Sequence, residues 1–263
     1  MPETESGGNR TREAILSIRN IRHSYKTRKG GELEVIRDLS LDVEYGEFLG
    51  IVGSSGSGKT TLLKILAGLV KPDSGTVLYK NKPLDGPTPA ISLVFQLPAL
   101  FPWLTVLENV MLALRSFDNM TQEEKIARSR TFLDIVGLSG FESAYPGELS
   151  GGMKQRTVLA RALVTNPDVL LMDEPFSSVD PLTAVSLRRE VDMMRVSETI
   201  PPSSVVLVSH NVEEIVELSD RVIVLTSRPA RIAGELRISM ERPRDRRSAD
   251  FYDYVDKIFT LMS

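Results

Sequence analysis

The sequence has no cysteine and no apolar run long enough to cross a bilayer. Without thiols the chain can form neither a disulfide framework nor a thiolate metal site, which suits a reducing cytoplasm. A spanning helix needs about 18 or more apolar residues, and the polar stretch 1–12 lacks the apolar core of a signal peptide. We therefore expect any contact with a membrane to come through a partner.

The charge balance is also undistinguished. The 32 basic and 35 acidic residues give a net charge of −3, and the one arginine-rich stretch, 242–247, is interrupted by Pro243 and Asp245. We expect no nucleic-acid partner.

The sequence has no internal repeat and no long heptad array, which disfavours repeat proteins and coiled-coil ATPases. The chain has 263 residues, of which 41% are hydrophobic. That suffices for one core with a subdomain.

One glycine-rich segment carries the main clue to function. It matches the phosphate-binding pattern G-x-x-x-x-G-K-[ST] at every specified position, with Gly53, Ser54, Ser55, Gly56, Ser57, Gly58, Lys59 and Thr60. An apolar run at 48–52 precedes it, as expected of a buried parallel strand, and helical spacing begins at Thr61. The motif thus has the strand, loop and helix context that a nucleoside triphosphate site needs.

The residue types of this loop follow from the chemistry of phosphate binding. Glycines let successive N–H groups turn toward phosphate oxygens, where a Cβ would intrude. The helix N-terminus and Lys59 supply positive charge, while the Thr60 hydroxyl can ligate the Mg²⁺ that accompanies ATP. The alternative, a flexible Gly/Ser turn, explains none of these choices.

A second apolar run, 169–172, ends in Asp173 and Glu174. It predicts a buried strand that delivers two carboxylates to the edge of the sheet where ligands bind. Asp173 would hold Mg²⁺, and Glu174 is suited to polarise the water that attacks the γ-phosphate. The alternative is a strand that ends in two solvated acids.

Between these motifs, residues 149–156 read Leu-Ser-Gly-Gly-Met-Lys-Gln-Arg. Alone, Ser150, Gly151 and Gly152 would be only a loop and a helix cap. In combination, the chain resembles the ATP-binding subunit of an ABC transporter over nearly its whole length. The resemblance implies that these three residues cap the γ-phosphate bound by a second subunit, so that two subunits enclose two ATP molecules.

Further matches fall in the order of that family. Gln96 ends a strand-like run and resembles the glutamine that senses magnesium and the attacking water; Asp180 lies in the segment that resembles the loop crossing the dimer interface. His210 resembles the histidine that contacts the γ-phosphate, and Tyr25 the aromatic residue that stacks on adenine. Taken singly, Gln96 could be a surface glutamine, His210 an ordinary polar residue at a strand end and Tyr25 a packing residue.

The resemblance predicts an α/β fold of the P-loop NTPase, ABC ATPase type. Segments 14–22 and 33–43 predict an N-terminal antiparallel β-layer, and helical patterns at 106–114 and 122–136 predict an inserted helical subdomain. The expected strands of a mainly parallel core sheet are 48–52, 75–80, 91–95, 168–173, 204–209 and 220–226. We expect one ABC ATP-binding domain over 1–263, with its nucleotide-binding core at 13–96 and 164–263 and its helical signature subdomain at 97–163. Apolar residues at helical spacing in 250–261 predict a final helix packed on the core.

Residues 97–110 bear on the subtype. They contain the only tryptophan, Trp103, and two prolines that prevent a long helix. We expect an irregular surface groove there, where the family seats a short helix of its membrane partner, although Trp103 could instead pack inside the helical subdomain. Segments 102–110 and 219–232, the latter with Arg228-Pro229, resemble importers for nitrate, sulfonates and taurine.

The resemblance implies an ATPase at the cytoplasmic face of the inner membrane, a peripheral subunit that powers uptake of a small solute through a separate permease. Its partners would be a second ATP-binding subunit, expected to be a copy of itself, the permease and, indirectly, a solute-binding protein. Phe101, Ser178-Val179 and Asn211 depart from the usual pattern without removing a catalytic group.

Three alternatives remain. The ATPase of an exporter or lipid-transport system shares the catalytic set. A soluble ABC ATPase of translation or DNA repair usually carries two cassettes, a zinc module or a coiled-coil insertion, which this sequence lacks. A non-hydrolysing nucleotide-gated module is disfavoured by Glu174 and His210.

Overall fold

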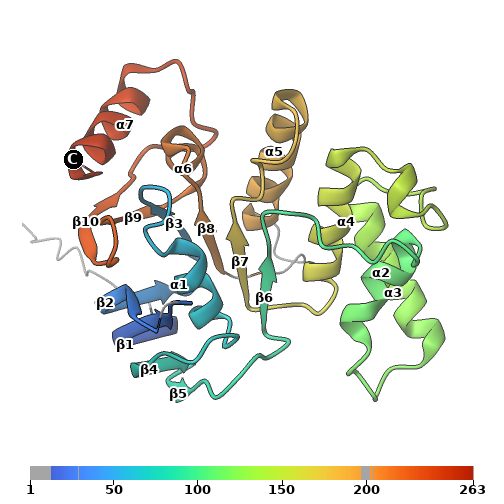
Figure 1. Cartoon of the computed structure of the whole chain (residues 1–263). Coiled ribbons are helices and arrows are strands. Elements are labelled where there is room, and N and C mark those ends of the chain that lie inside the picture. Colours follow the sequence, from blue (N-terminus) through green and yellow to red (C-terminus); the bar gives the residue numbers. More distant parts are fainter. Residues whose placement is uncertain (1–12, 29, 197–201, 203, 263) are drawn as a thin grey trace, which may run out of the picture.

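The computed structural model describes residues 13–28, 30–196, 202 and 204–262. These residues form two sheets and a set of helices (Figure 1). No helix within the described ranges is both long and apolar enough to span a bilayer.

The first sheet is antiparallel, with strand order β2-β1-β4-β5. Its strands are β1 (Ala14–Lys26), β2 (Glu32–Glu44), β4 (Ser74–Tyr79) and β5 (Lys82–Pro83). The expected β-layer is confirmed and is larger than expected. The segment near 75–80, which we assigned to the core sheet, instead pairs with β1, with Val77 opposite Ile18. Its sequence, Ser-Gly-Thr-Val-Leu-Tyr, is compatible with a strand of either sheet, so only the pairing partner distinguishes them.

The second sheet has strand order β10-β9-β3-β8-β7-β6. Its strands are β3 (Phe48–Val52), β6 (Ile91–Val94), β7 (Val169–Asp173), β8 (Ser204–Val208), β9 (Arg221–Leu225) and β10 (Ile232–Arg237). All neighbours are parallel except β9 and β10. Every residue of β3, β7, β8 and β9 is buried, as expected for strands covered on both faces.

Some helices cover the core sheet, and others form a separate group beside β6 (Figure 1). They are α1 (Lys59–Leu66), α2 (Val106–Met111), the 3₁₀ turn η1 (Leu112–Leu114), α3 (Gln122–Ile135), the 3₁₀ turn η2 (Pro146–Glu148), α4 (Gly151–Leu163), α5 (Pro181–Val196), α6 (Val212–Leu218) and α7 (Ala249–Met262). Helices α2, α3 and α4 come between β6 and β7 in the chain and pack on one another, as an inserted helical unit does.

The core sheet separates two apolar clusters. Along β3, Leu49 and Ile51 face the cluster shared with α1 and the antiparallel sheet, whereas Phe48 and Val52 face the cluster shared with the other helices. This alternation follows from the two-residue period of a strand. Helix α7 adds Phe251, Val255 and Ile258 to the second cluster, so the expected packing of the C-terminal helix is observed.

Candidate active site

The loop 53–58 connects β3 to α1 and leaves the helix N-terminus open. Gly58 is the cap residue, with φ of 107° and no side-chain hydrogen bond to the helix. A Cβ at this position would lie 2.9 Å from the side chain of Val35, so glycine is needed for both conformation and space. The first N–H groups of α1 have no intrahelical partner and are suited to bind an anion.

Lys59 lies at the centre of this loop. Its Nζ donates hydrogen bonds to the carbonyls of Gly53 (2.8 Å) and Ser54 (2.9 Å). Burial lowers the pKa of Lys59, and the charges of Glu174 and Asp173 partly oppose that shift. A bound phosphate would supply the strong countercharge that a buried ammonium lacks.

Three side chains from separate strands meet at one edge of the core sheet. Glu174 Oε2 lies 2.9 Å from His210 Nδ1 and 3.3 Å from Gln96 Nε2. Because β6, β7 and β8 are parallel neighbours, the loops that follow them emerge side by side. The structure thus brings together three residues that we predicted separately. Glu174 has φ of 48°, and its N–H donates to the Val208 carbonyl at 2.9 Å. This backbone conformation is uncommon for glutamate.

The residues expected to bind magnesium, Thr60, Gln96 and Asp173, offer few oxygen donors, as expected for a metal ion that binds together with ATP. Asp173 is buried; burial raises its pKa, while a hydrogen bond with Thr60 acts in the opposite sense. The Gln96 amide nitrogen bonds to Glu174 and Ser177, which leaves its oxygen for a metal. Within the described ranges no cluster of three or more His, Cys, Asp or Glu side chains gathers. Such a sparse donor set fits Mg²⁺, which takes part of its shell from phosphates and water.

A cavity of about 380 Å³ lies beside the Lys59 loop; Asp173 and His210 are not part of its lining. Of the expected nucleotide-binding residues, Tyr25, Ser55, Gly56, Gly58, Lys59, Thr60, Thr61, Gln96 and Glu174 line it. Gly53, Ser54 and Ser57 shape the loop without lining the cavity, and Ser57 is buried with its Oγ unpaired. Three residues that we did not assign to the nucleotide, Leu33, Val35 and Arg228, also line it.

Tyr25 belongs to the apolar part of the cavity lining. The residue is 40% exposed, its hydroxyl lies 3.4 Å from Thr61 Oγ1, and its ring is nearly perpendicular to that of His23 at a centroid distance of 4.7 Å. With Leu33 and Val35 beside it, this half-exposed ring offers a surface on which a base can stack.

The signature residues form a separate site. Ser150 caps α4 by accepting a hydrogen bond from the Met153 N–H, and a Cβ on Gly152 would lie 2.3 Å from the Thr183 side chain. Asp180 accepts a hydrogen bond from the Thr183 N–H at 3.0 Å at the start of α5, and hydrogen bonds from Thr183 lower the pKa of Asp180. None of Ser150, Gly151, Gly152 or Asp180 lines the cavity around Lys59. Within one chain, these residues are therefore not brought to the phosphate loop.

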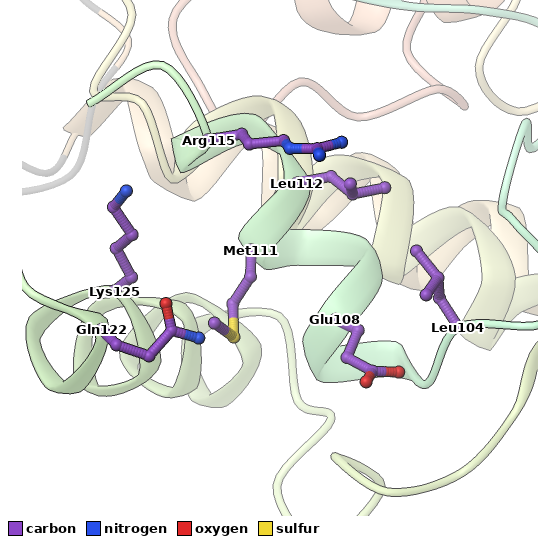
Figure 2. A pocket seen from close by; sticks show the side chains of 7 residues that line it. All are labelled: Leu104, Glu108, Met111, Leu112, Arg115, Gln122 and Lys125. Atoms are coloured by element: carbon purple, nitrogen blue, oxygen red, sulfur yellow. The ribbon is translucent and has the colours of Figure 1, made fainter. Parts of the chain in front are cut away.

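A groove lies between α2 and α3 (Figure 2). It is lined by Leu104, Glu108, Met111, Leu112, Arg115, Gln122 and Lys125. Figure 2 shows Met111 in the middle, with Gln122 and Lys125 on one side and Leu104 on the other. We expected a groove formed by residues 97–110, but only Leu104 and Glu108 of that segment line this one, and Trp103 does not. The Trp103 side chain is 69% exposed and its ring meets that of Phe101 at 5.4 Å, so it is not packed inside the helical unit.

One buried residue sets the shape of the loop before α2. Asn109 Oδ1 accepts from the Phe101 N–H at 2.8 Å, and Asn109 Nδ2 donates to the carbonyls of Leu104 (3.0 Å) and Thr105 (2.9 Å). We gave Asn109 no role from sequence. An asparagine amid apolar residues in a loop-to-helix segment is the signal that could have indicated it.

The fold and the cavity together define a P-loop nucleotide-binding protein. Its expected fold class is confirmed by a solved dimeric ATP-binding cassette in a post-hydrolysis state, bound to ADP and Pi. That cassette aligns with a TM-score of 0.75 and 28% identity, covering 86% of this chain and 100% of that chain.

The ABC transporter family model matches residues 36–177. An uncharacterised ABC transporter ATP-binding protein of Methanocaldococcus jannaschii is 42% identical over 247 residues, 94% of this chain and 91% of that protein. The nitrate import ATP-binding protein NrtD of Synechocystis sp. is 41% identical over 244 residues, 89% of this chain and 90% of that protein. The chain belongs to the ABC transporter family as an ATP-binding subunit, an ATPase coupled to transport.

Proposed function

We propose that this chain powers the uptake of a small solute of the nitrate, sulfonate or taurine type through a separate permease. The observation that carries the ATPase part is the meeting of Glu174, His210 and Gln96 beside the Lys59 loop. The likeness to a nitrate import subunit along 90% of its length favours import over export. The subunit would act at the cytoplasmic face of the membrane, bound through its partner.

In this proposal Lys59 and the N–H groups of 53–61 bind the phosphates, and Tyr25 stacks on adenine. Thr60, Asp173 and Gln96 would hold the Mg²⁺ that accompanies ATP. The metal ion would neutralise part of the negative charge of the phosphates. Glu174 Oε2 accepts a proton from the attacking water, and His210, at 2.9 Å, orients that carboxylate. Gln96 links the carboxylate to the metal side of the site.

The signature of a second subunit would complete each site. Ser150, Gly151 and Gly152 open α4 away from the chain's own nucleotide cavity, so their helix N-terminus is free to face another molecule's γ-phosphate. Asp180 would lie at the same interface, since Thr183 links it to Gly152. We propose that residues 97–163 form the subdomain that presents this signature, and that 13–96 and 164–263 form the nucleotide-binding core.

The groove between α2 and α3 would receive a short helix of the permease. Leu104, Met111 and Leu112 offer an apolar floor, while Arg115 and Lys125 add positive charge and Glu108 adds negative charge. This mixture suits an amphipathic helix laid into a groove.

The test is copurification from native membranes. We would gently solubilise membranes that contain the tagged chain and identify its partners, using Met111→Glu in the groove and Tyr252→Glu on exposed α7 as matched variants. We expect a multispanning permease with the wild type and Tyr252→Glu, and its loss with Met111→Glu. A solute-binding protein encoded beside it supports import, whereas soluble partners alone would contradict the proposal.

A further inference from the structure

Arg228 lies beside the phosphate loop although it belongs to a distant part of the sequence. It follows β9, which is a parallel neighbour of β3, and Val224 pairs with Val52, the last residue of β3. The loop after β9 therefore begins next to the loop that carries the phosphate-binding glycines. A Cβ on Gly53 would lie 3.2 Å from the Leu225 carbonyl, which shows how closely the two loops pack.

The loop that carries Arg228 is held rigidly. Thr226 Oγ1 accepts a hydrogen bond from the Arg231 N–H at 3.0 Å and donates to the Pro229 carbonyl at 3.1 Å. The Ala230 N–H donates to the Val35 carbonyl at 2.7 Å, which ties the loop to β2. The position of the Arg228 backbone is thus set by hydrogen bonds that do not involve its own side chain.

The guanidinium of Arg228 lies directly on the phosphate loop. Its Nε donates to the Gly56 carbonyl at 3.1 Å, and its Nη2 lies 2.8 Å from the place that a Cβ of Gly56 would occupy. Gly56, with φ of 74°, therefore provides both the loop conformation and the space for this arginine. Arg228 also lines the nucleotide cavity.

The charge of Arg228 is not matched by a carboxylate. No acidic side chain within the described ranges lies at ion-pair distance from it, and one hydrogen bond to Gly56 uses only part of its N–H donors. Lys59, the other cation of the cavity, likewise rests on loop carbonyls, those of Gly53 and Ser54. Two cations thus hold the loop in shape and keep donors for an anion.

We propose that Arg228 is a nucleotide-binding residue, which donates a hydrogen bond to a phosphate oxygen of the bound nucleotide while it braces the loop at Gly56. This inference rests on the proposed nucleotide site. A guanidinium is suited to this double task because its donors lie in a planar fork, whereas a lysine offers a point charge on a flexible chain.

The experiment compares Arg228→Gln, Arg228→Lys and the control Arg231→Gln in the full chain. Arg231 belongs to the same loop, but it does not line the cavity. Its positive charge instead helps to lower the pKa values of Glu34 and Asp38. Equilibrium titration gives the Kd for ATP, thermal unfolding without nucleotide gives the Tm, and ATPase assays separate KM from kcat.

We expect Arg228→Gln to raise the Kd and KM for ATP about 10-fold, because the variant loses one charge-assisted hydrogen bond to the nucleotide. Its kcat should stay within about 2-fold of wild type. Arg228→Lys should recover part of the affinity, and Arg231→Gln should bind as wild type does. The Tm values of the empty proteins should be nearly the same, because the bond from Arg228 to the Gly56 carbonyl is a single exposed hydrogen bond.

Unchanged ATP affinity in Arg228→Gln would overturn the inference. So would a lowered Tm of the empty protein together with weak binding in both Arg228 variants, because that result assigns Arg228 to loop folding alone. Failure of the wild type itself to bind ATP would refute the proposed nucleotide site instead.

Discussion

Replacement of Glu174 by glutamine tests the chemistry of the site most directly. Glutamine has the size of glutamate and keeps one carbonyl oxygen, which can still accept from His210 or Gln96, now at 2.9 and 3.3 Å from Glu174 Oε2. It cannot take a proton from water. The variant should therefore bind ATP with a Kd within about 3-fold of wild type and lose the hydrolytic step.

The expected loss of turnover follows from the worth of a positioned base. General-base catalysis contributes about 10²- to 10⁴-fold, which corresponds to about 3–5 kcal/mol of activation free energy. Phosphate release measured at saturating MgATP gives kcat, and equilibrium titration gives the Kd. Asp250→Asn, the same chemical change at the exposed start of α7, is the matched control and should retain wild-type turnover.

A second variant tests whether Glu174 and His210 act as one unit. If His210 works by orienting the carboxylate, His210→Ala should slow the wild type strongly and slow Glu174→Gln by less than about 3-fold further. Turnover of Glu174→Gln within about 3-fold of wild type would refute the assignment of the base. Independent, multiplicative losses from the two substitutions would instead contradict their coupling.

Three further predictions concern the loop, the signature and the segment before α2. Lys59→Ala should weaken ATP affinity and lower turnover together, because it removes a cation from ground and transition state alike; unchanged Kd and kcat would contradict it. Gly152→Ala should lower the Tm, since its Cβ would lie 2.3 Å from the Thr183 side chain. Alanine otherwise favours a helix over glycine. Gly151→Ala, where the nearest atom is 3.8 Å from the added Cβ, is the stability control, and equal Tm values would oppose this reasoning. Asn109 is fully buried, and its amide bonds to three carbonyls and one N–H. Asn109→Ala should cost about 2–4 kcal/mol in denaturant unfolding, because buried donors and acceptors lose their partners, and a change below about 0.5 kcal/mol would contradict it.

Pairing partners were the part of the fold least accessible from sequence. The strand at 74–79 was recognised, but it was placed in the wrong sheet, because its short apolar run fits a core strand and a layer strand equally well and its pairing with β1 is not local information. Helices α5 and α6 and strand β10 were not identified, although the alternation of helices and strands in that region was expected. Their apolar residues are interspersed with charged ones that pair across elements, as Arg188 on α5 does with Glu214 on α6 at 3.3 Å.

What the sequence determined by itself is the local chemistry. The phosphate loop, the strand ending in Asp173 and Glu174 and the start of α4 at Gly151 depend on residues close together in the chain, whose backbone preferences act locally. The bounds that the sequence predicts for the strands β3, β7 and β8 agree with the structure within a few residues.

Only the tertiary structure decided which of these groups meet. Gln96, Glu174 and His210 converge because β6, β7 and β8 are parallel neighbours, and Arg228 reaches Gly56 because β9 lies beside β3. The same arrangement keeps Ser150 away from the cavity around Lys59. Strand order is set by hydrogen bonds and burial between segments distant in the chain, and no local preference encodes those distances.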